Sequence, residues 1–188
     1  MPKAKDTRTR LVEAATKMTY RYGFNHTALA DIAKEAKVPL GNVYYYFKTK
    51  DEIGHAIVEH RMAHFRTQLA ELNQLASPQE RLCGFVQIKI DNCQELARSG
   101  CPVGTLSSEL HKHRGAVAEN SRILFAEGLA WMERQFREMG KGAEARGLAV
   151  HLLSVTQGVS VLAHAFNDPK MITAEAKRLK EWIRSLNA

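Results

Sequence analysis

The chain has 188 residues, of which 45% are hydrophobic and 25% charged, with only five prolines. These proportions are typical of a soluble globular protein and exclude collagen-like, low-complexity and disulfide-stapled miniprotein classes. Lys and Arg number 27 against 20 Asp and Glu, which gives a formal net charge of +7. Ten of the bases but only four of the acids lie in residues 1–50. This asymmetry predicts a basic surface, and hence a polyanionic partner, at the N-terminal end.

Apolar residues recur at intervals of three and four along nearly the whole chain, which predicts an all-α fold. The first stripe covers residues 11–22 and ends at Gly23. Thr27 is placed to cap a second, short helix that ends near residue 36. Pro39 opens a third helix that runs to about residue 47. Three helices joined by turns this short predict one compact unit.

Longer helical patterns fill the rest of the chain. They are predicted over residues 50–75, 78–99, 103–111, 116–139, 148–166 and 172–186. Residues 147–167 hold no Asp, Glu, Lys or Arg and are long enough to cross a bilayer. Six polar side chains interrupt this stretch, so we predict a helix buried in a protein core and no membrane partner.

Three cysteines, Cys83, Cys93 and Cys101, are too few and too odd in number for a disulfide framework. No charged-then-apolar leader precedes the first helical pattern. Both observations lead us to expect a reduced, cytoplasmic compartment.

The N-terminal motif reads Tyr22-Gly23-Phe24, then Thr-Ala-Leu-Ala-Asp-Ile-Ala over residues 27–33, then Val-Pro-Leu-Gly-Asn-Val-Tyr-Tyr-Tyr-Phe-Lys-Thr-Lys over residues 38–50. In order and spacing, over about the first 55 residues, this motif resembles the N-terminal domain of the tetracycline-repressor-like (TetR) family. The resemblance implies a transcriptional repressor with a helix-turn-helix in residues 1–49. It also implies a helical effector-binding and dimerisation domain in residues 50–188, whose effector releases the protein from a palindromic operator.

The third helix carries residue types that suit base recognition. In a helix-turn-helix the second helix enters the major groove, while flanking cations and backbone amides hold phosphates. Asn42 can pair with adenine, Leu40 can touch a thymine methyl, and Gly41 permits close approach. The resemblance places Leu40, Asn42 and Tyr45 at base-facing positions. The full predicted set of DNA contacts is Thr27, Pro39, Leu40, Gly41, Asn42, Tyr44, Tyr45, Tyr46, Lys48 and Lys50.

Other residues of this unit are given supporting roles. Ile32, Ala33, Val43 and Phe47 are expected to form its small core. A basic arm ahead of the first helix is expected either to reach DNA or to act as a solubilising tail, and it comprises Lys3, Lys5, Arg8 and Arg10.

Two positions depart from the family pattern. Lys37 stands where the family usually has Gly in the turn, so it must adopt a left-handed conformation at a cost of about 1 kcal/mol. Pro39 stands where a capping hydroxyl is frequent, so one phosphate or capping contact is expected to be missing.

The effector site is predicted only as a set of apolar and thiol side chains in the second half of the chain, each of which is more readily interpreted as core. The set is Phe85, Ile88, Cys101, Phe125, Trp131, Val155 and Leu162. Cys101 lies between Gly100 and Pro102 at a predicted helix start, where unpaired amides stabilise a thiolate. Its segment also resembles that of family members that sense electrophiles or oxidants through a cysteine, so release by thiol modification is the alternative.

The two last helices have narrow apolar stripes, which indicate either core packing or a four-helix interface with a second copy. We predict a homodimer on the second interpretation. Its interface residues would be Leu148, Leu152, Val155, Val159, Leu162, Leu179, Ile183 and Leu186.

Other functions fit the sequence less well. His60 and His64 are one turn apart, but Arg61 follows the first of them where a zinc protease has Glu, so we expect no metal and no cofactor. An enzyme using Cys101 with His111 would leave the N-terminal charge without a purpose. A helical adaptor that binds only protein would leave Asn42 unexplained. We therefore expect no enzymatic activity, and double-stranded DNA, a small effector and a second copy as partners.

Overall fold

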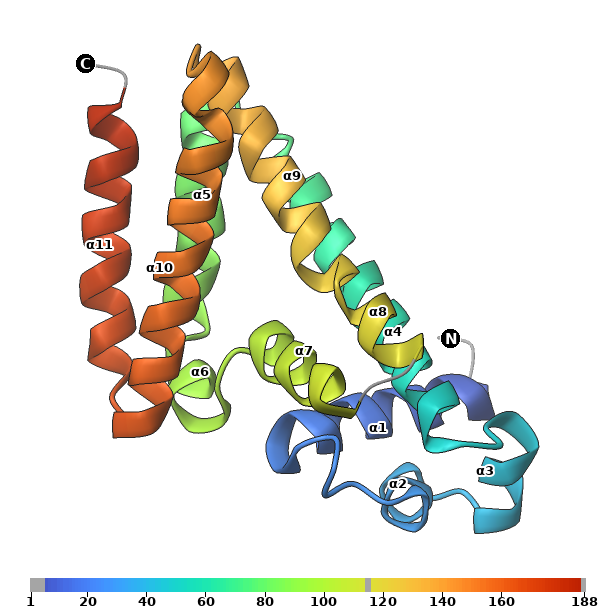
Figure 1. Cartoon of the computed structure of the whole chain (residues 1–188). Helices are drawn as coiled ribbons and strands as arrows, with labels where there is room; N and C mark the ends of the chain where they lie inside the picture. Colours follow the sequence, from blue (N-terminus) through green and yellow to red (C-terminus); the bar gives the residue numbers. More distant parts are fainter. Residues whose placement is uncertain (1–5, 114–115, 187–188) are drawn as a thin grey trace, which may run out of the picture. The chain divides into compact units, whose positions relative to one another are not determined.

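The structure is a computed structural model and describes residues 6–113 and 116–186. Within these residues the chain forms helices and no strand, which confirms the predicted all-α fold. In chain order the elements are α1 (Thr7–Tyr22), α2 (Leu29–Ala36), α3 (Leu40–Tyr46), α4 (Lys50–Leu72), α5 (Pro78–Asp91), α6 (Cys93–Ser99), α7 (Pro102–His113), α8 (Ala116–Ser121), α9 (Ile123–Glu138), the 3-10 helix η1 (Gly142–Glu144), α10 (Ala145–Phe166) and α11 (Pro169–Ser185) (Figure 1).

Contacts divide the chain into two compact units. The N-terminal unit comprises the chain up to His64 together with Thr105–Leu124, and the C-terminal unit comprises Phe65–Gly104 and Phe125–Ala188. The division of contacts therefore does not fall between residues 49 and 50, where the sequence pattern placed the domain boundary. A separation of function at residue 50 stays a prediction.

Helix α1 begins and ends at residues with clear local reasons. The Asp6 carboxylate caps it by accepting the Thr9 N–H (2.7 Å). It ends at Gly23, whose φ of 87° is readily available only to glycine. Between these ends, Leu11 and Ala15 are fully buried and α1 packs on α2. The last residue of the predicted stripe, Tyr22, is exposed instead, because it lies at the end of α1.

The start of α2 differs from the prediction. Its N-cap is Ala28, whose backbone N–H donates to the Asp31 carboxylate (3.1 Å). The Thr27 hydroxyl does not cap the helix, because it turns back and donates to the Gly23 carbonyl (2.8 Å). The predicted capping role of Thr27 is therefore wrong.

Lys37 occupies the turn between α2 and α3 in the left-handed conformation, with φ 53° and ψ 48°. This confirms the left-handed conformation predicted from its replacement of the usual glycine. The Lys37 backbone is well bonded, since its N–H donates to the Lys34 carbonyl and its carbonyl accepts from the Arg10 guanidinium (both 3.1 Å).

The core of the helix-turn-helix is the predicted one, since the four expected side chains are buried: Ile32, Ala33, Val43 and Phe47. Arg8 stacks over the Phe47 ring, with its guanidinium carbon 5.6 Å from the ring centroid. Arg8 and Arg10 both lie within α1, so their assignment to an arm ahead of the first helix is wrong. Lys3 and Lys5 lie outside the described residues.

Residues from the middle of the chain complete the N-terminal unit. A Cβ at Gly54 in α4 would meet Phe24 at 3.1 Å and Val117 of α8 at 3.2 Å, so these elements pack closely there. The Asn120 amide nitrogen lies 3.1 Å from Nδ1 of His55. Helix α8 and α7 from Thr105 onward are therefore part of this unit.

The C-terminal unit has α5, α10 and α11 packed side by side, with α6 against α10 and α11 (Figure 1). Its main core includes the fully buried Leu82, Phe136 and Leu152. Both tryptophans of the chain, Trp131 and Trp182, pack in this core, whereas all five tyrosines lie in the N-terminal unit.

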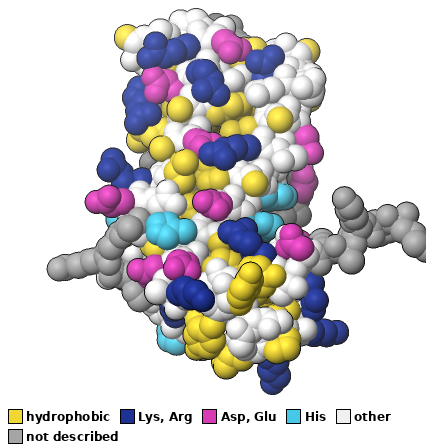
Figure 2. Space-filling model, turned by 90° about the vertical axis from the view of Figure 1, so that its right-hand side faces the viewer, with side chains coloured by type: hydrophobic (Ala, Val, Ile, Leu, Met, Phe, Trp, Pro, Cys, Tyr) yellow, Lys and Arg dark blue, Asp and Glu magenta, His cyan; other side chains and the backbone are white. Residues whose placement is uncertain are grey.

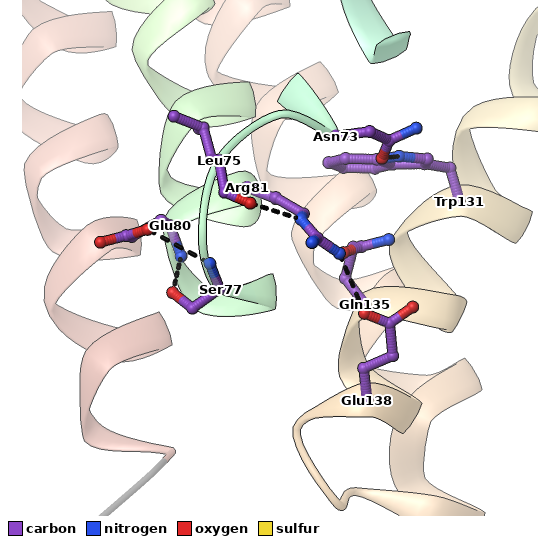
Figure 3. A network of polar contacts seen from close by, with 8 residues as sticks. All are labelled: Asn73, Leu75, Ser77, Glu80, Arg81, Trp131, Gln135 and Glu138. Atoms are coloured by element: carbon purple, nitrogen blue, oxygen red, sulfur yellow. Dashed lines mark hydrogen bonds and ion pairs between the residues drawn. The ribbon is translucent and has the colours of Figure 1, made fainter. Parts of the chain in front are cut away.

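A polar network fastens the turn after α4 to α9 (Figure 3). Arg81 donates to a backbone carbonyl of that turn (3.0 Å), to Gln135 (3.3 Å) and to Glu138 (3.0 Å). The Trp131 indole N–H donates to the Asn73 amide oxygen (2.8 Å), so the polar edge of a buried ring is satisfied. These contacts position α9 within the C-terminal unit.

Two predicted helices are each divided in two. The helix predicted over residues 78–99 breaks at Asn92, whose side-chain amide donates to the Ile88 carbonyl (2.8 Å) and competes with the backbone ladder. The helix predicted over residues 116–139 breaks after Ser121, whose hydroxyl donates to the Ala118 carbonyl (2.7 Å). Short polar side chains therefore interrupt patterns whose apolar spacing is continuous.

Helix α10 together with η1 is long and apolar enough to cross a membrane by composition. It packs on α11 and α6, however, and buries Thr156 and Ser160 in the protein. Their hydroxyls donate to backbone carbonyls of the same helix (2.9 and 2.7 Å). One face of the helix thus serves the protein core, whereas the prediction was a helix buried as a whole.

Candidate nucleic-acid interface

The outer face of α3 presents side chains suited to reading bases. Leu40 is 41% exposed and Tyr45 75% exposed, and Asn42 lies on the same open surface. A Cβ placed on Gly41 would meet nothing within 4 Å, so the helix start is open to a close-approaching ligand. The opposite face holds Val43, which is fully buried. The amphipathic division of α3 thus leaves the predicted base-facing residues free to contact DNA.

The tyrosine trio lies on the surface and not in the core. Tyr44, Tyr45 and Tyr46 are all exposed, and the rings of Tyr45 and Tyr46 meet edge to face with centroids 5.1 Å apart. Figure 2 shows hydrophobic side chains beside Lys and Arg on the face of the N-terminal unit. Phenol hydroxyls on such a surface can donate to phosphate oxygens.

The two lysines of the motif have different surroundings. The Lys48 side chain is exposed, and its backbone N–H donates to the Glu52 carboxylate (2.7 Å). Lys50 instead donates to the Asn25 carbonyl (3.0 Å) and lies over the Phe24 ring, 5.0 Å from the centroid. Burial lowers the pKa of the Lys50 ammonium, and the negative charge of Glu109 opposes that shift. Lys48 is therefore the better-placed phosphate contact, while Lys50 is engaged within the protein.

Two further predicted contacts occupy distinct positions. Pro39 is the exposed N-cap of α3, which has no side-chain capping bond, as expected for a proline in that place. Thr27 is only 2% exposed and its hydroxyl is used internally. The structure therefore corrects the predicted phosphate contact of Thr27, because this side chain is not exposed to DNA.

Glu109 of α7 is the residue of this unit that sequence reasoning missed. Its carboxylate accepts the backbone N–H groups of Phe24 and Asn25 in the turn after α1. No motif signals this contact, because the partners are 85 and 84 residues apart.

Residues 11–57, which contain the helix-turn-helix, match the model of the bacterial regulatory proteins of the tetR family. The helix-turn-helix segment of the chain is therefore of the tetR-family type. The HTH-type transcriptional repressor NemR of Escherichia coli K12 is 32% identical over 108 residues, which cover 56% of this chain and 54% of NemR. The match therefore spans about half the length of NemR. The transcriptional regulator AcuR of Cereibacter sphaeroides is 28% identical over 159 residues, or 83% of this chain and 69% of AcuR.

Solved structures of TetR-family proteins share the fold over nearly the whole chain. The reduced form of E. coli NemR has a TM-score of 0.81 at 21% identity, covering 94% of this chain and 96% of NemR. A TetR regulatory protein from Rhodobacter sphaeroides has a TM-score of 0.82 at 21% identity, covering 93% and 97%. The helical arrangement of this chain is therefore that of these solved structures.

Of the seven predicted effector-lining residues, four lie in or against one core of the C-terminal unit and three lie elsewhere. Phe85 and Trp131 are buried in the main core of the C-terminal unit, with ring centroids 6.2 Å apart, and Ile88 and Val155 pack against the same core. Phe125 is only partly buried. Leu162 is 53% exposed, so its assignment to an internal pocket is wrong.

Cys101 lies directly before α7 and is 5% exposed. It packs in a second, smaller cluster of the C-terminal unit with Leu96, Ala163 and Ile172. Arg98, one of the cations expected to favour a thiolate, is exposed and paired with Glu95 (3.4 Å). The thiol is thus shielded by apolar neighbours. Among the residues that the structure describes, no group of three or more His, Cys, Asp or Glu side chains is arranged to hold a metal.

The predicted dimer interface is partly corrected. Leu152, Leu179 and Ile183 fill the core of their own chain, so they are not available to a second copy. Leu148, Val155, Val159 and Leu186 are half-buried. The large apolar side chains of α10 that are exposed are Val150, Val161, Leu162 and Phe166. These exposed residues therefore share only Leu162 with the predicted interface.

Proposed function

We propose that the chain is a DNA-binding transcriptional repressor that binds a palindromic operator as a homodimer and is released by a small-molecule effector. The observation that carries this proposal is the division of α3, whose inner face is anchored by Val43 while Leu40, Asn42 and Tyr45 face outward. A helix held in this way can lie in a major groove without losing its own core. The proposed activity is equilibrium binding and not catalysis, in a cytoplasmic setting.

Salt-dependent DNA binding tests the proposal. A duplex pool with a random central segment, enriched by rounds of binding to the full chain, supplies the probe. Affinity for the enriched duplex should fall steeply as salt rises, with about 6 to 10 phosphates engaged per dimer. Recovery of no enriched sequence, or affinity that is insensitive to salt, would refute DNA-sequence recognition.

The homodimer is proposed through the open face of α10. Leu162 and Phe166 are exposed apolar side chains one helical turn apart, and covering them with the same face of a second copy would form a two-fold interface. Leu162→Glu should shift the chain from dimer to monomer in sedimentation, because it places two like charges near one symmetry axis. If the variant remains a dimer, the interface does not lie on this face of α10.

Release by thiol modification is the second candidate, favoured by the Gly100-Cys101-Pro102 segment directly before α7. Because Cys101 is shielded, we expect an oxidant to react with it only as the surrounding cluster opens. Cys101→Ser should then bind the enriched duplex normally but resist release by hydrogen peroxide. An unchanged peroxide response would eliminate this candidate and leave a bound effector as the route of release.

A further inference from the structure

The turn between α1 and α2 is held by a side chain from α7. The backbone N–H groups of Phe24 and Asn25 both donate to one carboxylate oxygen, Oε2 of Glu109, the Asn25 bond being 3.2 Å long. The other oxygen lies 3.0 Å from where a Cβ on Gly23 would stand. The carboxylate therefore covers all three residues of the turn, and glycine leaves the room that it needs.

The same turn is bonded from its other side by α4. Lys50, the first residue of α4, donates to the Asn25 carbonyl (3.0 Å) and covers the Phe24 ring. The Glu109 charge stabilises the charged form of Lys50, as the direction of its effect on the Lys50 pKa indicates. Glu109 thus joins α7 to the N–H groups of the α1–α2 turn, and Lys50 joins α4 to a carbonyl of the same turn.

This linkage bears on the recognition helix through the chain itself. Residues 23–25 lead directly into α2, and Lys50 follows α3 after a short connection. Both ends of the α2-turn-α3 segment are therefore fixed at the Glu109 site. The strain at Lys37 in the middle of that segment makes the fixed ends more important, because the turn alone does not favour its conformation.

We propose that Glu109 is a positioning residue for DNA binding, which holds the helix-turn-helix in its DNA-competent arrangement without contacting DNA. The inference rests on the proposed function. A role in overall stability alone would lower the unfolding temperature and leave the affinity of the folded protein unchanged. A positioning role lowers affinity at temperatures where the variant is fully folded, because fewer molecules hold the competent arrangement.

The test compares three variants of the full chain. Glu109→Gln keeps one oxygen able to accept both N–H bonds, whereas Glu109→Leu keeps the approximate size and accepts none. Glu71→Leu, at an exposed site on the part of α4 in the C-terminal unit, is the matched control, since it makes the same change in charge. Loss of one acidic side chain by itself should strengthen binding to a polyanion, which is opposite to the effect expected of Glu109→Leu.

We expect Glu109→Leu to bind the enriched duplex about tenfold more weakly, the size expected when protected donors lose their acceptor. Glu109→Gln should stay within about threefold of the parent, and Glu71→Leu should bind at least as tightly. Amide exchange of Phe24 and Asn25 should accelerate in Glu109→Leu only. The salt slope should be unchanged in all three, because none of them removes a phosphate contact.

The outcomes separate the two proposals. If the parent chain enriches no duplex, the proposed function fails. If the parent binds and folded Glu109→Leu binds equally tightly, the positioning role of Glu109 is overturned while the function stands. If Glu109→Leu does not fold, Glu109→Asp is tested in its place. This variant keeps the negative charge, but its side chain is one methylene shorter, so the carboxylate lies farther from the two N–H groups. Parent-like affinity and amide protection in Glu109→Asp would then overturn the inference.

Discussion

Replacing Lys37 with glycine should stabilise the protein. A left-handed conformation costs a residue with a Cβ about 1–2 kcal/mol, and glycine does not carry this cost. Glycine also makes the unfolded chain more flexible, which offsets about 0.5–1 kcal/mol of the gain. The Lys37 side chain is exposed, and the contacts of its backbone N–H and carbonyl do not depend on it. The net gain in unfolding free energy should therefore be about 0.5–1 kcal/mol.

For a chain of this length that gain corresponds to a rise of roughly 1–4 °C in the unfolding temperature. Calorimetry at fixed protein concentration measures it, since a dimer melts in a concentration-dependent way. Lys37→Ala is the matched control, because it removes the same charge and side chain but keeps the Cβ, so it should gain nothing. If Lys37→Ala is stabilised as much as Lys37→Gly, the gain comes from reduced charge repulsion and the strain argument is refuted.

Three further predictions concern DNA contacts, the core and a thiol. Asn42→Ala should reduce discrimination between the enriched duplex and variants of it by about 1–3 kcal/mol. Lys48→Ala should instead weaken binding to all duplexes alike and reduce the salt slope by about one. If both variants weaken binding to all sequences equally, the assigned roles are refuted. Phe136→Ala should lower the unfolding free energy by about 3–5 kcal/mol in urea titrations, because the ring is fully buried, and a loss under 1 kcal/mol would contradict that packing. Burial raises the pKa of the Cys83 thiol, so the rate of its alkylation should rise with pH at a midpoint above the ordinary value of about 8.5, as mass spectrometry can measure; a midpoint below that value would contradict the direction.

Local chemistry made the helix-turn-helix predictable from sequence. Gly23 ends α1 because glycine readily takes a positive φ, whereas the left-handed turn at Lys37 was implied by the family resemblance and not by the residue itself. The spacing of Val43 and Phe47 likewise indicated which face of α3 is buried. Signals of this kind need no knowledge of distant residues.

Features that depend on distant residues were not predictable in the same way. Nothing near Phe24 or Asn25 in the sequence points to Glu109, and Thr27 was assigned a cap that Asp31 supplies from within α2. The apolar stripe of α11 was equally compatible with a core or an interface, because periodicity shows that a face is covered and not what covers it. The structure places Ile183 in the core of its own chain.

The segregation of aromatic residues gives each unit its own optical reporter. Excitation at the red edge of the absorption band selects the two indoles, Trp131 and Trp182, and so follows the C-terminal unit alone. The phenols include three on the outward surface of α3, where stacking or bonding to a nucleic acid would alter their emission. One unlabelled sample could therefore show whether an added compound first disturbs the indole signal or the phenol signal. The order of those two changes would reveal which end of the molecule responds first.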